Sequence, residues 1–216
     1  FGLSTPMAVV AGVFHIINHA TFKASLFMAA GIIDHECGTR DLRRLGNLRR
    51  YMPYTAALAI VASLAMAGIP LLNGFLSKEM FFAEALDAGN DRGFRIAISI
   101  AALLYGVFGL AYSLRFVHDA FLGRGPRALP VEPHEPQVWM RIPVAVLVVL
   151  CLAVGMLPAL TVEPVLRTAV MGTLGDAAPA FSLAVWHGWN LPLAMSIGGV
   201  FGGGQPLVTP RELPTV

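Results

Sequence analysis

Two histidines and a lysine follow one another at four-residue intervals near the start of the sequence. They are His15, His19 and Lys23, in the run HIINHATFK. Each four-residue step of a helix climbs about 6 Å and turns about 40° past a full circle, so the three side chains share one face. Histidine titrates nearest neutral pH, and lysine, unlike arginine, can release a proton. The spacing predicts a proton relay; the alternative is helix–helix hydrogen bonding by the histidines, with Lys23 reaching an interface.

The only other lysine, Lys78, lies within a second apolar stretch, in AGIPLLNGFLSKEMFFAEAL. An ionisable side chain at membrane depth is costly and marks an ion path by default. Gly68, Pro70 and Gly74 precede it, and proline removes a helical hydrogen bond and clashes with the preceding turn. We therefore expect a discontinuous helix with Lys78 in its second half, as transporters use near mid-membrane. A simple proline kink is the alternative.

Two further ionisable residues are secondary candidates for the ion path. Glu79 follows Lys78 directly, but sequence neighbours point to different faces of a helix. His187, in WHGWN, lies near the start of the last apolar segment. Glu84 and Asp87 fall near a segment end, where we expect them to be solvated.

No metal site or cofactor is predicted. The two histidines of HIINH have the spacing of a zincin, but the general base would be a Glu directly after the first histidine, where Ile16 stands. Cys37 and Cys151 are far apart and form no CxxC pair.

The composition is that of a lipid-embedded chain. Charged residues make up 13% of the 216 residues, against about 25% in soluble proteins, and the mean hydropathy is +0.68. Backbone polar groups in lipid must be satisfied internally, so we predict an all-α, polytopic membrane helix bundle of about five transmembrane helices, one of them discontinuous. The expected segments are residues 6–33, 55–86 (broken near 68–74), 96–122, 142–160 and 182–202.

The arginines predict an orientation. Five lie between the first two segments and three between the third and fourth, with fewer in the other loops. The positive-inside rule then places loops 34–54 and 123–141 in the cytoplasm. No basic run of the kind that binds nucleic acid is present. Because the chain opens on Phe1 and enters an apolar segment at once, we read it as a fragment of a longer protein.

These motifs resemble a known family. HIINHATFKASLFMAAGIIDHECGTRDLRRLGNLRRYMP and AGIPLLNGFLSKE resemble the antiporter-like subunits shared by respiratory complex I and the Mrp cation/proton antiporters. Within that family, NHATFKASLFMAAGIIDHE, GTRDLRRLG and AVWHGWNLPL are similar to the large A subunit of Mrp complexes. The resemblance is specific over residues 15–80 and weaker over 140–195.

The resemblance implies a fold and a role. Family members contain two inverted five-helix repeats, and the fragment looks like the later part of the second repeat with the helices that follow. In the family pattern the His-x3-His-x3-Lys helix connects the central axis to the next helix, and the lysine after the broken helix ends the relay. Those roles fall on His15, His19, Lys23 and Lys78.

The expected function is that of a Na+/H+ antiporter subunit in the inner (plasma) membrane of a bacterium, where other subunits, lipid, protons and Na+ are its partners. It would be a secondary transporter and not an enzyme. The first alternative is a proton-pumping subunit of complex I or of a membrane-bound hydrogenase. The second is a passive scaffold descended from an antiporter, and the two lysines, both at relay positions, argue against it.

Overall fold

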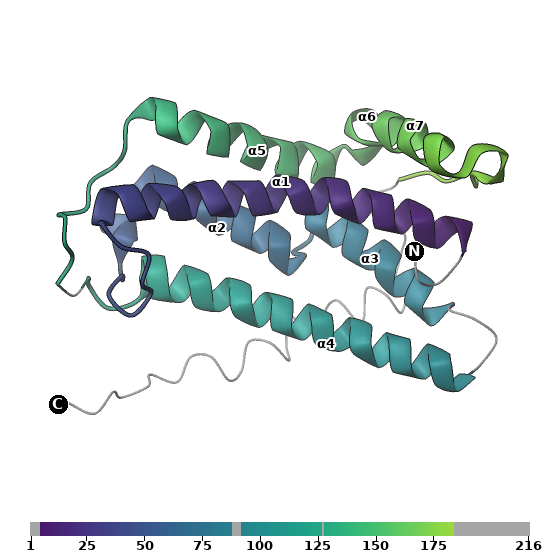
Figure 1. Ribbon diagram of the computed structural model, residues 1–216, viewed down its shortest axis with the longest axis horizontal. Coiled ribbons are helices and arrows are strands. Elements are labelled where there is room, and N and C mark those ends of the chain that lie inside the picture. Colours follow the sequence, from purple (N-terminus) through teal and green to yellow (C-terminus); the bar gives the residue numbers. More distant parts are fainter. Residues whose placement is uncertain (1–4, 88–91, 127, 184–216) are drawn as a thin grey trace.

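Helices form nearly all of the ordered architecture. The computed structural model describes residues 5–87, 92–126 and 128–183, and these contain no strand (Figure 1). The elements in chain order are α1 (Pro6–Cys37), η1 (Leu48–Arg50), α2 (Pro53–Ala67), α3 (Asn73–Leu86), α4 (Arg92–Val117), the π-helical turn η2 (His118–Leu122), α5 (Val138–Met156), α6 (Pro158–Thr161), α7 (Glu163–Leu174) and η3 (Gly175–Ala177). The all-α prediction is confirmed.

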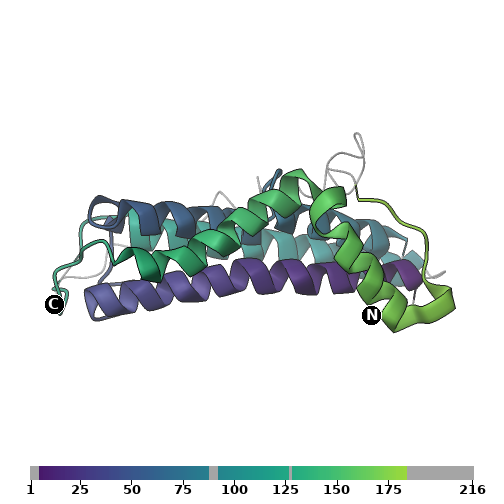
Figure 2. The same cartoon turned by 90° about the horizontal axis from the view of Figure 1, so that it is seen from above.

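The long helices run along a common axis. Helix α1 packs against α2, α3 and α5, while α4 packs against α2 and α3. Helices α2 and α3 follow one another along the bundle, and α7 lies across the end where α1 begins (Figures 1 and 2). The broken helix is therefore enclosed by α1 on one side and α4 on another.

Three helices among the described residues are long and apolar enough to cross a membrane. They are α1, α4 together with its π-helical turn, and α5, whereas α2 is a shorter apolar helix. Large apolar side chains such as Phe27, Phe108 and Val149 are exposed on them, as the outer surface of a lipid-embedded bundle requires. The fifth expected helix, over 182–202, lies almost wholly outside the described residues.

The second expected segment is interrupted. Helix α2 ends at Ala67, and Gly68 caps it in the left-handed region at φ 76°, which favours glycine. Pro70 and Leu71, the latter also at positive φ, complete the connection before α3 starts at Asn73. A Cβ on Gly74 would lie 1.9 Å from the Ala65 carbonyl oxygen, so only glycine allows α3 to begin this close to α2.

The fourth expected segment, 142–160, differs from the structure at its end. Helix α5 stops at Met156 because a residue before proline, here Leu157, avoids the α conformation. The chain then forms α6 and the amphipathic α7, which was not predicted. Leu166 and Val170 of α7 are buried in the core beside α1, and Arg167 pairs with Glu163 at 2.7 Å.

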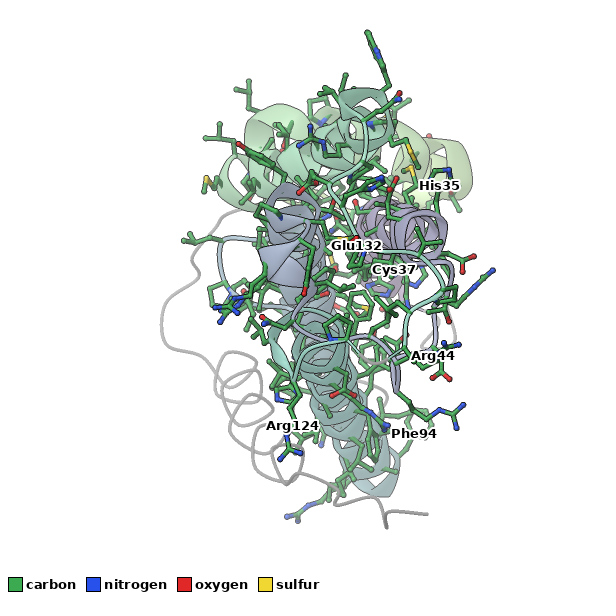
Figure 3. The ribbon with its side chains drawn as sticks, turned by 90° about the vertical axis from the view of Figure 1, so that its left-hand side faces the viewer. His35, Cys37, Arg44, Phe94, Arg124 and Glu132 are labelled. Atoms are coloured by element: carbon green, nitrogen blue, oxygen red, sulfur yellow. The ribbon has the colours of Figure 1, made fainter. Side chains whose placement is uncertain are left out.

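One end of the bundle is closed by the segment between η2 and α5. Glu135 accepts hydrogen bonds from the backbone N–H groups of Tyr54 and Thr55 and from the Thr55 hydroxyl, at 3.0, 3.1 and 2.7 Å, and so caps α2. Its neighbour His134 contacts the buried carboxylate of Glu36 at the end of α1. Figure 3 looks onto this end, where His35, Cys37 and Glu132 are labelled.

The arginine-rich loop after α1 lies at the same end. Arg43 donates hydrogen bonds to the Asp41 carboxylate, which lowers the pKa of that carboxyl to about 2. Arg40 pairs with Asp34 at 3.0 Å. Arg49 and Arg50 are exposed beside it. This is the end of the molecule that the positive-inside rule assigns to the cytoplasm.

Candidate functional site

Lys78 is buried at the helix break, with 6% of its surface exposed. Its ammonium donates a hydrogen bond of 3.3 Å to the carbonyl oxygen of Ala67, the last residue of α2. That carbonyl lies at the negative end of the α2 dipole, which favours a cation there. The ammonium also lies 5.6 Å from the centre of the Phe82 ring, a cation–π arrangement.

Two glycines make room for the Lys78 side chain. A Cβ on Gly68 would lie 2.7 Å from Lys78 Cδ, and one on Gly106 of α4 would lie 3.0 Å from Cε. The lysine stem therefore passes between the end of α2 and the middle of α4. Gly106 was not predicted as part of the site, because its role depends on a helix that follows in the chain.

His15 reaches the same region from α1. Its Nδ1 lies 3.3 Å from the hydroxyl of Ser77, the residue before Lys78. One turn along α1, the fully buried Asn18 donates a hydrogen bond of 3.1 Å to the carbonyl oxygen of Asn73. These two contacts fix the register between α1 and the second half of the broken helix.

The rest of the α1 stripe extends away from the break. The rings of His15 and His19 are 5.7 Å apart between centres, but the His19 side chain is exposed on the described part of the chain. Lys23 is half-buried, and its ammonium lies 5.7 Å from the centre of the Tyr112 ring on α4. Lys23 lines a separate small cavity of about 100 Å³.

A cavity of about 680 Å³ joins His15 and Lys78. Helices α1, α3 and α4 form its walls, and most of the lining side chains are apolar, among them Phe81 and Ile98. The structure thus brings two of the four predicted relay residues to one space, and it leaves His19 and Lys23 farther along α1.

Glu84 is a residue that the sequence analysis judged wrongly. It is half-buried and lines the cavity with His15 and Lys78, and its carboxylate accepts a hydrogen bond of 2.8 Å from the Thr5 hydroxyl. Its position six residues after Lys78 was a visible signal, but Thr5 is 79 residues away in the chain. Glu79 is buried as well, at 8% exposure, and His187 lies outside the described residues.

The described residues include no group of three His, Cys, Asp or Glu side chains that could hold a metal ion. What they bring together is one ammonium, one imidazole and one carboxylate around a largely apolar space. Such groups can pass protons between themselves through water, and they offer no nucleophile with a base to activate it.

The sequence matches a family model described as NADH:quinone oxidoreductase/Mrp antiporter, over residues 1–105. A Rhizobium meliloti protein, named as the A/B subunit of a probable K(+)/H(+) antiporter, is 59% identical over 93% of this chain, which covers 20% of that protein. The large Na(+)/H(+) antiporter subunits of the same type from Alkalihalophilus pseudofirmus and Bacillus subtilis are 40% and 39% identical, each over 91% of this chain and 26% of their own length. The chain thus spans about a fifth to a quarter of these relatives.

Solved structures give the same likeness. A chain of the Mrp complex from Dietzia sp. DQ12-45-1b superposes with a TM-score of 0.81 at 36% identity, over 94% of this chain and 21% of that chain. Respiratory complex I from Thermus thermophilus matches with a TM-score of 0.66 at 22% identity, over 82% of this chain and 36% of that chain, which is a likeness of fold alone.

Proposed function

This chain belongs to the family of antiporter-like membrane subunits that Mrp antiporters share with NADH:quinone oxidoreductases, and we propose that it forms part of the ion path of a monovalent cation/proton antiporter. Protons move along His15, His19 and Lys23 of α1 and reach Lys78 at the helix break. The observation that carries the proposal is the cavity shared by His15 and Lys78.

The Lys78 contacts support a group that exchanges its proton. Its main polar partner is a neutral carbonyl, that of Ala67, and the walls around it are largely apolar. A fixed structural charge at this depth would be compensated by a carboxylate, because an unpaired buried charge is costly. A lysine with a neutral partner can instead alternate between the charged and neutral forms as protons arrive and leave.

The relatives' names support antiport and leave the cation to be measured. The relative at 59% identity is named for K+, and those at 39–40% are named for Na+, which was the expectation from the sequence. Quinone-linked pumping is less well supported, because the complex I likeness is one of fold. We further propose that the protein works in the inner membrane of a bacterium with other subunits of an antiporter complex.

The test is exchange by the full complex in inside-out membrane vesicles. A proton gradient is established, Na+ or K+ is added, and the collapse of the gradient is followed with a pH-sensitive dye. Lys78→Ala should reduce exchange at least tenfold with both cations, while Ala83→Ser, at an exposed position of the same helix, should leave it unchanged. Normal exchange by a fully assembled Lys78→Ala complex would refute the proposal.

A further inference from the structure

Glu84 lies in the last turn of α3, at the end of the cavity farthest along the helix from the break. Six residues separate it from Lys78, about 9 Å along the helix axis. Its carboxylate is held by the Thr5 hydroxyl, which donates a hydrogen bond of 2.8 Å to Oε2. A solvated side chain at a helix end would need no such partner.

Thr5 also begins α1. Its hydroxyl oxygen accepts a hydrogen bond of 3.0 Å from the N–H of Ala8, and the first turn of this 32-residue helix contains no acidic residue. Glu84 therefore supplies, from another helix, the negative charge that the positive end of a helix dipole favours. Two independent contacts, one hydroxyl and one helix terminus, hold the carboxylate at the cavity.

The charges around the cavity make Glu84 distinct. Among the described residues that line it, Glu84 is the one carboxylate, and the other titratable groups are His15 on α1, Lys78 on α3 and Tyr105 on α4. Arg92 and Arg95 begin α4, which forms the third wall, and Asp87 follows the last residue of α3. The carboxylate is thus the acidic member of a set whose other members are basic or phenolic.

The position of Glu84 gives a direction. The start of α1 and the end of α3 meet at one end of the bundle, and the arginine-rich loops lie at the other (Figure 1). Since the arginines mark the cytoplasmic side, Glu84 lies on the external side of Lys78. The three ionisable groups of the cavity are therefore ordered from the exterior toward the break.

We propose that Glu84 is the external proton-entry residue of this cavity. A proton from external water bonds to a carboxylate oxygen of Glu84, then leaves for a water molecule of the cavity or for the neutral amine of Lys78, which restores the carboxylate. This proposal rests on the proposed antiport function, and adds the group through which external protons reach the relay.

The experiment compares Glu84→Gln with Asp87→Asn in the full complex. Asp87 is exposed at the same helix end and lines no part of the cavity, so it controls for the loss of one negative charge at that surface. Exchange is measured in vesicles while the pH on the external side is varied and the opposite side is held constant. Glu84→Gln should lower exchange at least fivefold and flatten its dependence on external pH, whereas Glu84→Asp should recover part of both.

A second variant keeps the test decisive if Glu84→Gln fails to assemble. Thr5→Val removes the hydroxyl but keeps the carboxylate, and it should shift the external pH of half-maximal exchange while the complex assembles normally. An unchanged pH profile in Glu84→Gln, or in Thr5→Val where only that variant assembles, overturns the entry role. If Lys78→Ala also exchanges normally, the antiport proposal itself fails; if only the Glu84 and Thr5 variants are normal, the entry role alone is wrong.

Discussion

The ammonium of Lys78 donates a hydrogen bond of 3.3 Å to the carbonyl oxygen of Ala67, so the second half of the broken helix caps the first. The residue that would carry the proton is thereby also the residue that satisfies the helix end exposed by the break. A neutral lysine would still donate to the carbonyl, but without the charge that makes this contact strong. Proton transfer and the geometry of the break are linked through this one bond.

Lys78→Arg distinguishes a proton carrier from a fixed charge. Arginine keeps the positive charge but cannot lose its proton in a protein, so exchange should fall as far as in Lys78→Ala. Its planar head group must also fit where Gly68 and Gly106 leave room for a lysine stem. The measurement is cation-dependent proton exchange, together with the amount of assembled complex. Near-normal exchange by the Arg variant would mean that Lys78 supplies charge alone.

The glycines beside Lys78 provide a steric prediction. Gly68→Ala should cost about 1 kcal/mol or more in backbone strain, because φ is 76° there, and its Cβ would also meet Lys78 Cδ at 2.7 Å. Gly106→Ala should act through the lysine alone. Both should reduce exchange several-fold, while Gly31→Ala on α1, whose Cβ would have no neighbour within 4 Å, should not. Equal activity in all three variants would show that the lysine is not confined here.

Glu135 makes a prediction about stability. Glu135→Gln weakens the hydrogen bonds to the start of α2 and should cost roughly 1–3 kcal/mol, since bonds to a charged partner are the strong ones. The thermal unfolding temperature of the purified complex should fall by several degrees, and the amides of Tyr54 and Thr55 should exchange hydrogen faster. Glu132→Gln, an exposed change three residues earlier, is the control. An identical effect in both variants would argue against a capping role.

Glu163 gives a prediction about pH outside the membrane-spanning helices. The Leu183 N–H and then Arg167 donate hydrogen bonds to its carboxylate, and they lower the pKa of Glu163. A lowered pKa means that the contact stabilises the folded state above the ordinary carboxyl pKa of about 4.3, and that this stability is lost as pH falls through the folded value. Protection of the Leu183 amide, corrected for intrinsic exchange, should therefore decrease at acidic pH. In Glu163→Gln it should be low at every pH.

The sequence predicted the features that depend on near neighbours. The relay stripe, the glycines and proline of the break, and Lys78 all lie within short runs whose helical geometry is known in advance. The contacts between Thr5 and Glu84 and between Thr55 and Glu135 join residues 79 and 80 positions apart. Helix packing creates such pairs, and no local pattern encodes them. Helix α7 was missed because it is amphipathic and less apolar than the spanning segments.

The broken helix is anchored at both of its outer ends. Glu135 holds the start of α2 at the arginine-rich end of the bundle, and Glu84 holds the last turn of α3 to the start of α1 at the other. A rod pinned at both tips and jointed in the middle can bow without swinging either tip. Separation of Lys78 from Ala67 would then be a movement confined to the centre of the bundle, and the two faces of the membrane need not open together for it to occur.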